Sequence, residues 1–328
     1  MGSDPFLPPK AQEIAFPRDP LTRVSCYTLC MRFGSDPTRP RTAEAAVDLE
    51  KLKTLILTPE QYREHPFARK GEEEARSYTY ALGNKDRLLT MFGSRHITDS
   101  ADPLYGKIHA AFAAMQPDLV FVEGMRETLE RDFKVGRLTP EETKEIHENL
   151  YTATLAKDRG IDVESPEPRH SDEIAHLLEQ GFEKRDIAAH TIYRQVNQFR
   201  RSHPSASLAA CREYLIPYLE RFRGDSGWGE EELLAIEQEM LAELDFADLD
   251  TYGRLVDPIP WEGKPWSPIN EVSGASSAYR DQHILERIAE AMKTHKRLFV
   301  VYGASHAVSL EPALRALMKD PGPQGNAS

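Results

Sequence analysis

Short apolar runs alternate with helical patterns between Arg87 and about residue 170. Each run is long enough for one buried strand, and the runs are LLTMF (88–92), LVFV (119–122) and the shorter RGIDVE (159–164). Between the first two, apolar residues recur on one helical face, with Asp102 as the expected N-cap and Pro103 at the first helical position. Strand, helix, strand, helix, strand predicts a parallel α/β sheet.

Residues 171–257 show a different pattern. Four consecutive stretches have helical spacing with no strand-like run between them: SDEIAHLLEQGF, KRDIAAHTIYRQVNQFR, SLAACREYLIPYLERFR and GEEELLAIEQEMLAELDFADL. The third carries an apolar stripe made of Leu208, Cys211, Leu215, Tyr218 and Phe222. We expect these residues to form a helical subdomain inserted in the sheet domain.

The sheet pattern resumes at residues 258–320. A helix is expected over SSAYRDQHILERIAEAMKTH (276–295), followed by the strand LFVVY (298–302) and a last helix from about Ser309. The expected fold class is therefore α/β. A central, mostly parallel sheet would be built from two related halves, residues 87–170 and 258–320, and flanked by helices.

The two ends of the chain give weaker patterns. Residues 1–86 are expected to form a partly irregular N-terminal extension, in which TRVSCYTLCMRF (22–33) is an edge-strand candidate. The stretch from Thr58 to Tyr78 reads as one polar helix that begins with a Thr-x-x-Gln capping box. Residues 321–328 have the composition of a disordered tail.

Charge and cysteine content narrow the function classes. The formal net charge of −12 would repel a polyanion, which argues against a nucleic-acid ligand and leaves a peptide or a small molecule as the expected substrate. No stretch approaches the roughly 20 apolar residues that span a bilayer. The odd set Cys26, Cys30 and Cys211 lacks a disulfide-framework spacing, so we expect a reducing, cytoplasmic location.

Two strands are followed by the same motif. RLLTMFGSRH (87–96) and RLFVVYGASH (297–306) both end in Gly-x-x-His, and Glu123 holds the equivalent place after LVFV. Ligands of open α/β sheets bind at the carboxyl ends of the strands, so His96, Glu123 and His306 should meet there, with the imidazoles within about 8 Å. Two His and one carboxylate predict a divalent-metal site with open positions for water and substrate.

Other residues compete for a place in this site. Glu164 and Glu167 follow the third strand, and either carboxylate would be positioned to complete it; a surface turn is favoured for Glu167, while Glu164 is kept as a candidate substrate-binding residue. Arg280 is a candidate for binding a substrate carboxylate or a transition-state oxyanion, with Asp281 beside it. The alternative reading of Arg280-Asp281 is a salt-bridged helix start.

The remaining histidines carry no pattern of their own. We expect His190, His203 and His283 to lie on the surface.

The string GSRH…VFVEG…SAYRDQHILERIAEAM…LFVVYGASH resembles the TraB/Tiki family, within the wider group of erythromycin-esterase-like and ChaN-like proteins. The family's marks are two Gly-x-x-His motifs, a Glu after an early strand, and Arg-Asn or Arg-Asp on the helix before the last strand. Carried over residue by residue, they correspond to His96, Glu123, Arg280 and His306, and to Asp281, where many members have Asn.

The resemblance covers residues 87–165 and 275–320 and implies an α/β fold of two related halves. The Tiki branch is described as metal-dependent proteases that use manganese or cobalt, which places these metals ahead of zinc. The erythromycin-esterase branch hydrolyses an ester with a His base, and the ChaN branch binds haem. The resemblance thus implies hydrolysis without specifying the substrate.

We therefore expect a metal-dependent hydrolase, acting on peptide bonds. His96, Glu123 and His306 would bind the metal or activate its water, and Arg280 would stabilise the oxyanion. Two alternatives stay open. One is a metal-independent, esterase-like hydrolase with a His general base, and the other is a non-catalytic module that binds haem or another ligand.

Overall fold

A computed structural model describes residues 48–69, 77–83, 86–96, 99–124, 139, 143, 147–202, 207–243, 255–258 and 266–319. The chain divides into two compact units, residues 1–46 and 47–328, and all described residues belong to the second. The expected edge strand at 22–33, the tail at 321–328 and His203 lie outside the described residues.

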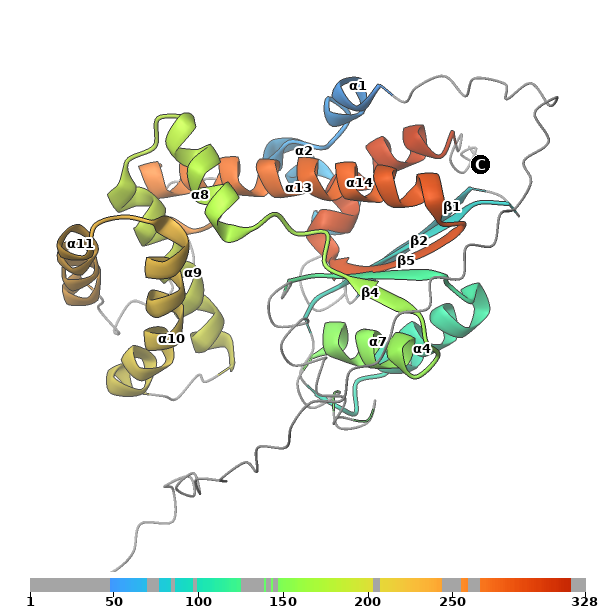
Figure 1. Ribbon diagram of the computed structural model, residues 1–328, viewed down its shortest axis with the longest axis horizontal. Helices are drawn as coiled ribbons and strands as arrows, with labels where there is room; N and C mark the ends of the chain where they lie inside the picture. The colour runs from blue at the N-terminus through green and yellow to red at the C-terminus, as the bar shows by residue number, and fades with distance from the viewer. Residues whose placement is uncertain are drawn as a thin grey trace, which may run out of the picture. The chain divides into compact units, whose positions relative to one another are not determined.

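Five strands form one mixed sheet in the order β1-β2-β5-β3-β4 (Figure 1). The strands are β1 Ser77–Gly83, β2 Leu88–Ser94, β3 Leu119–Val122, β4 Asp162–Glu164 and β5 Arg297–Gly303. Strand β1 runs antiparallel to β2, and the other pairings are parallel. The predicted α/β class is confirmed, and the sheet is mostly parallel with one antiparallel edge strand that the sequence reading did not include.

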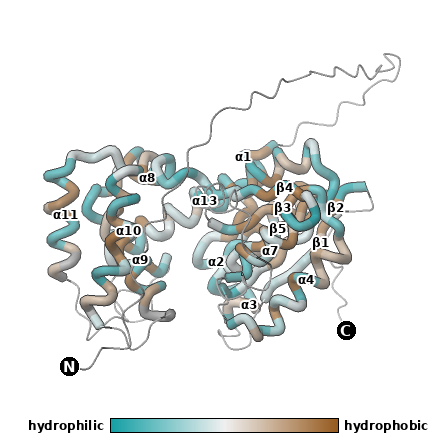
Figure 2. Tube along the Cα trace, turned by 60° about the horizontal axis from the view of Figure 1, so that its bottom comes forward, coloured by the Kyte–Doolittle hydropathy of each residue, from teal (hydrophilic) through white to brown (hydrophobic). Residues whose placement is uncertain are grey.

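Helices cover both faces of the sheet, which explains why the strands are nearly continuous apolar runs. Alternate residues point to opposite faces: Leu89 and Val300 pack with α13 (Pro268–Thr294) and α14 (Ala304–Leu317), whereas Phe299 and Val301 pack with α4 (Leu104–Met115) and α7 (Glu148–Lys157). Figure 2 shows the central strands coloured mostly brown, the colour of hydrophobic residues. The expected apolar faces of the helices are buried, through Leu104, Ile108, Phe112, Met115, Ile284, Ile288 and Met292.

Two helices begin earlier than their apolar patterns predict. Helix α13 starts at Pro268, where Ser267 and Asn270 form a capping box, so Arg280 lies in the middle of the helix and the expectation of a helix start there was wrong. Helix α14 starts at Ala304, directly after strand β5, instead of near Ser309. His306 therefore lies in the first turn of a helix and not in a loop.

The polar stretch after Thr58 is shorter as a helix than expected. Thr58 and Gln61 form the predicted capping box of α2 (Pro59–Glu64). The helix then ends at His65, because the residue before a proline disfavours helical angles, and α3 occupies Pro66–Arg69. The last two residues of the stretch belong to β1. Before it, α1 spans Leu49–Lys53.

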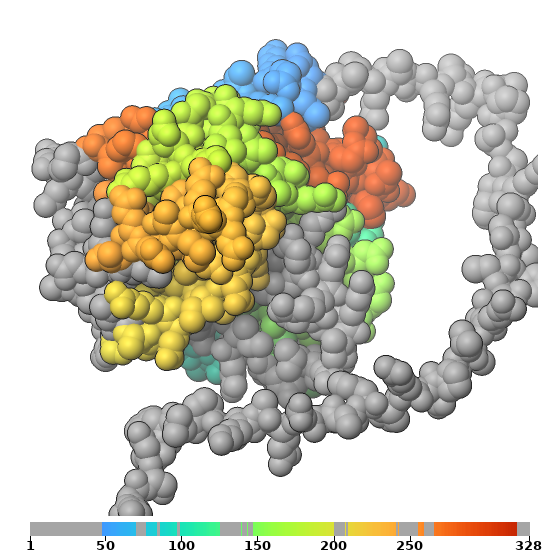
Figure 3. All heavy atoms as spheres, turned by 60° about the vertical axis from the view of Figure 1, so that its left-hand side comes forward, coloured from blue at the N-terminus to red at the C-terminus, as the bar shows by residue number. Residues whose placement is uncertain are grey.

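The four helices expected between residues 171 and 257 are present. They are α8 His170–Glu179, α9 Lys184–Ser202, α10 Leu208–Ser226 and α11 Glu230–Glu243. Their atoms form a continuous surface in the yellow-green to orange part of Figure 3. Two hydrophobic clusters hold them together, and each includes one residue of α13, Ile269 or Val272. Helix α13 thus packs on these helices and also on the sheet.

Crossing a bilayer requires a helix that is both long and apolar, and the described helices differ from this. None of them combines the necessary length and apolarity.

Candidate functional site

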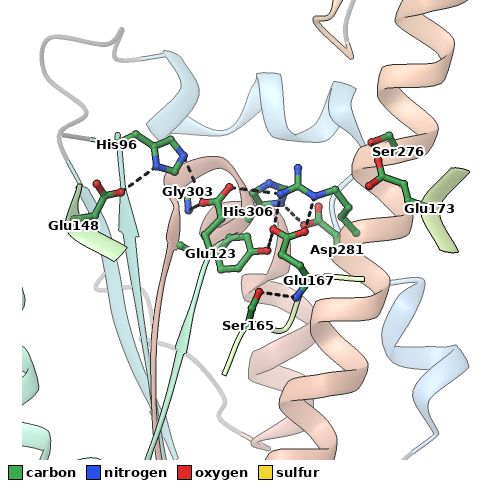
Figure 4. Close-up of polar contacts among 12 residues, drawn as sticks. His96, Glu123, Glu148, Ser165, Glu167, Glu173, Ser276, Asp281, Gly303 and His306 are labelled. Carbon is green, nitrogen blue, oxygen red and sulfur yellow. Dashed lines mark hydrogen bonds and ion pairs between the residues drawn. The ribbon is translucent and has the colours of Figure 1, made fainter. Parts of the chain in front are cut away.

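The four parallel strands each end in residues that meet at one edge of the sheet (Figure 4). His96 follows β2, Gly303 and His306 follow or end β5, Glu123 follows β3, and Glu167 follows β4. Side chains at the carboxyl ends of parallel strands share one edge, which is where open α/β sheets bind ligands. Sequence position relative to a strand end therefore located this site.

His96 bridges two carboxylates at the end of β2. Its Nδ1–H donates to Glu148 Oε1 at 3.0 Å, and its Nε2 lies 3.4 Å from Glu123 Oε2. The φ of His96 is 58°, a left-handed value that is uncommon outside glycine and that is associated with functional sites. Because a carboxylate only accepts, the Glu148 bond keeps a proton on Nδ1 and turns Nε2 toward Glu123.

Glu148 is the buried partner that holds His96. It is the first residue of α7, next to the N-cap His147, and its side chain is fully buried. Burial opposes its ionisation, but the hydrogen bond and the charge of His96 outweigh burial and lower the pKa of this carboxyl below its usual value. An ionised Glu148 therefore fixes both the orientation and the tautomer of His96.

Gly303 lies where three side chains of the site come together. A Cβ at this position would lie 3.1 Å from Glu123 Oε2, 3.3 Å from His96 Nε2 and 3.5 Å from His306 Cδ2. His96 Nε2 and His306 Cδ2 are therefore no more than about 7 Å apart, which confirms the expectation that the two imidazoles lie within about 8 Å of each other. The Gly303 amide donates to Glu123 Oε2 at 2.5 Å, so the glycine also holds this carboxylate.

His306 is oriented by Asp281 of α13. Its Nδ1–H donates to Asp281 Oδ1 at 2.5 Å, and the ring packs edge-on against Tyr302. Both side chains are nearly buried. A carboxylate on Nδ1 is the arrangement that orients a metal-ligating histidine and also the one that orients a general base, with Nε2 as the working atom in either case.

Arg280 is buried and bound to Glu167. Its Nε and Nη2 donate to the two Glu167 oxygens at 2.9 and 2.6 Å, and Nη2 lies 3.5 Å from Glu123 Oε1. The Tyr302 hydroxyl donates to the same Glu167 carboxylate. Burial alone would raise the pKa of Glu167, but the charge and hydrogen bonds of Arg280 lower it to about 2.

Glu167 and Glu164 have exchanged the roles that the sequence suggested. Glu167, expected on a surface turn, lies in the site, whereas Glu164, the candidate for substrate binding, is exposed and pairs with Arg287 at 2.6 Å. The turn after β4 accounts for part of the difference: the strand ends at Glu164, and Ser165 accepts a hydrogen bond from the Glu167 amide.

The histidines expected on the surface are placed differently as well. His190 is buried in α9, with 6% of its surface exposed. His283 is half-buried on α13, and its Nδ1–H donates to the Pro166 carbonyl at 2.8 Å, beside Glu167. Neither residue lies beside an apolar strand in the sequence, so no local signal marked them.

Two donor atoms of the site have the spacing that a divalent metal requires. Metal–ligand bonds of about 2.1 Å put neighbouring donors roughly 3.0 to 3.4 Å apart, and His96 Nε2 and Glu123 Oε2 are 3.4 Å apart. His306 reaches the same place with the ring edge that carries Nε2. In the part of the chain that the structure describes, no three His, Cys, Asp or Glu residues are already arranged as a complete ligand set. Two of the three expected ligands therefore meet at metal-ligand spacing.

Comparisons with known proteins add no relationship. No family model, no curated protein and no solved structure matches the chain.

Proposed function

We propose that this chain is a metal-dependent hydrolase that acts on peptide bonds. The observation that carries the proposal is the convergence of three side chains at Gly303: Glu123 Oε2, His96 Nε2 and His306 Cδ2 all lie within 3.5 Å of the position that a Cβ would take there. Two imidazoles and a carboxylate are suitable ligands for a divalent ion such as manganese or cobalt. Such an ion would polarise the substrate carbonyl and lower the pKa of a bound water.

The side chains around this position have separable roles in hydrolysis. Glu123 and His96 would hold the ion, with Glu148 fixing the His96 tautomer. His306 would bind at Nε2 or take the proton of the attacking water there, while Asp281 keeps the other ring proton on Nδ1.

Arg280 would supply the oxyanion donor. Glu167 engages Nε and Nη2, and among the described residues Nη1 has no hydrogen-bond partner, so Nη1 is the atom that remains for the substrate. Because the guanidinium is buried and held by two bonds, it is preorganised toward developing negative charge. Glu167 is the positioning residue in this scheme.

A second candidate function rests on one contact. The 2.5 Å bond between His306 Nδ1 and Asp281 makes an oriented His that needs no metal to act as a general base. The chain would then be an esterase-like hydrolase.

The same residues support a distant relationship to the TraB/Tiki family. In that relationship, helices α8 to α11 would be a subdomain inserted between two related halves and packed on α13.

Metal linkage separates these functions. Protein treated with chelator and then titrated with manganese or cobalt should gain melting temperature, because an ion that binds only the folded state stabilises it. His306→Ala should lose most of that gain. His295→Ala is the matched control, since His295 caps α13 next to the start of β5, at the opposite edge of the sheet.

An equal metal response in the parent and His306→Ala would contradict the ligand set. Ester hydrolysis that survives chelation but is lost in His306→Ala would support the metal-independent enzyme instead. A haem titration that gives a Soret band dependent on His306 would support the non-catalytic ligand-binding module.

A further inference from the structure

An aromatic residue precedes the glycine in both copies of the repeated motif. Phe92 holds this place in the first copy and Tyr302 holds it in the second. Both side chains are buried, but they lie in different hydrophobic clusters: Phe92 packs with α4 and α7, and Tyr302 packs with α13 and α14. At this place the two copies therefore differ by one buried hydroxyl group.

The Tyr302 hydroxyl is bound to the carboxylate of Glu167. It donates to Glu167 Oε1, the same oxygen that accepts from Arg280 Nη2 at 2.6 Å, and Arg280 Nε donates to Oε2 at 2.9 Å. Dashed lines at Glu167 in Figure 4 mark these bonds. Burial and the charge of Glu167 raise the pKa of Tyr302 well above its usual value, so the hydroxyl keeps its proton and remains a donor. Glu167 is thus held by a tyrosine and an arginine together.

The backbone around Glu167 is held by other groups. Ser165 Oγ accepts from the Glu167 amide at 3.3 Å, and His283 Nδ1–H donates to the Pro166 carbonyl at 2.8 Å. Loss of the Tyr302 hydroxyl would therefore leave this turn in place and remove a bond from the carboxylate alone.

The ring of Tyr302 has a separate contact with His306. The two ring centroids are 5.1 Å apart and the ring planes meet at 87°, which is the edge-to-face arrangement that aromatic pairs prefer. A phenylalanine at position 302 would keep this contact. Tyr302→Phe thus isolates the contribution of the hydroxyl.

We propose that Tyr302 is a positioning residue of the site, whose hydroxyl fixes the Glu167 carboxylate and thereby holds the Arg280 guanidinium next to Glu123. Arg280 Nη2 lies 3.5 Å from Glu123 Oε1, so a small movement of Glu167 would change where the guanidinium sits at the site. The inference rests on the proposed hydrolase function for its effect on turnover, because Arg280 is the oxyanion donor there. The positioning of Arg280 does not depend on the reaction.

A second Tyr-Glu-Arg triad provides a matched control. Tyr78 of β1 donates to Glu311 Oε2, and Arg315 Nε donates to Glu311 Oε1 at 2.8 Å. This triad shares no residue with the site. Tyr78→Phe therefore removes the same kind of hydroxyl–carboxylate bond as Tyr302→Phe, but away from Arg280.

Hydrogen exchange of the arginine Nε–H groups tests the positioning without turnover. The full chain is labelled with nitrogen-15, and the two signals are identified by their loss in Arg280→Lys and Arg315→Lys. In Tyr302→Phe the Arg280 Nε–H should exchange with water about tenfold faster than in the parent, because Glu167 has lost a hydrogen bond to a charged group and releases the arginine more easily. In Tyr78→Phe only the Arg315 Nε–H should exchange faster.

Hydrolysis of fluorescein-labelled casein with added manganese tests the consequence for the reaction. Tyr302→Phe should lower kcat about tenfold and leave KM almost unchanged, because the aligned oxyanion donor acts in the transition state. Tyr78→Phe should keep the parent's kcat. Melting curves of the same preparations give the rate per folded molecule, so a loss of stability alone cannot produce this difference.

An Arg280 Nε–H that exchanges equally fast in the parent and in Tyr302→Phe would overturn the positioning role. So would an equal loss of kcat in Tyr302→Phe and Tyr78→Phe. A parent that hydrolyses no casein, but whose Arg280 Nε–H responds to Tyr302→Phe as expected, would support the positioning role and count against the hydrolase.

Discussion

The two glycines of the repeated motif should respond in opposite ways to the same substitution. Gly303 has φ −56° and ψ 139°, which any residue adopts, and Gly93 is not among the residues with a positive φ. Alanine at either position therefore introduces no left-handed backbone strain. What differs is the set of atoms that the added methyl group meets.

At Gly303 the methyl group would meet side chains of the site, with the closest, Glu123 Oε2, at 3.1 Å. A shift of a few tenths of an ångström accommodates it, and Gly→Ala at compatible angles stabilises a chain by about 0.4–1 kcal/mol through the unfolded state. At Gly93 it would lie 2.7 Å from Ala307 Cβ and 2.8 Å from the Tyr78 carbonyl. Strand β1 or helix α14 must move, which costs about 1–3 kcal/mol.

Urea unfolding and metal titration of both variants measure the difference. Gly303→Ala should keep the parent's stability within about 1 kcal/mol, yet lose the gain in melting temperature on adding manganese or cobalt, because the methyl group fills the space between the ligands. Gly93→Ala should melt earlier, by about 2–4 °C for each kcal/mol lost, but keep its response to metal.

A Gly303→Ala variant that responds to metal like the parent would refute the assignment of the ion to this space. A Gly93→Ala variant as stable as the parent would show that the close approach of α14 to the strand does not constrain that glycine. Because each variant is the control for the other, general damage to the fold cannot produce the expected pattern.

Three further outcomes follow from the buried charges. Asp281→Asn should lower turnover about 10- to 100-fold with the fold retained, measured as rate per folded molecule, because it weakens the orientation of His306. Glu167 has a lowered folded pKa of about 2, so its contribution of about 3 kcal/mol is present above the unfolded value near 4.5 and is lost as pH falls toward 2; acid unfolding of Glu167→Gln should lack this loss. Arg280→Lys should cost about 3 kcal/mol in urea unfolding, since one buried partner of a bidentate pair is disrupted, and a change under 1 kcal/mol would contradict the pairing.

Local patterns were sufficient for the elements and for part of the site. Short apolar runs, separated by helical faces, predicted β2, β3, β4 and β5 and the α/β class. A residue's position just past a strand is also a local property. For this reason His96, Glu123 and His306 could be placed at one edge before any contact was known.

Element boundaries depended on contacts that the pattern does not contain. Helix α14 begins five residues before its expected start, because Gly303 ends the strand and Ala304 and Ala307 pack against Gly93. Strand β1 was not predicted: its first two residues were read as the end of a helix and the rest were left unassigned, because its pairing with β2 decides its structure. Arg280 was expected near the start of a helix but lies in the middle of α13, because the helix begins at Pro268.

The strand order and the pairing of charges were decided by the tertiary structure alone. Strand β5 lies between β2 and β3, which brings the Gly303 amide onto the carboxylate of Glu123, 180 residues earlier in the chain. Arg280 binds Glu167 instead of Glu164 across a separation of 113 residues. Glu164 and Glu167 are three residues apart and chemically alike, so only the turn after β4 and the packing of α13 determine which of them is buried beside the arginine.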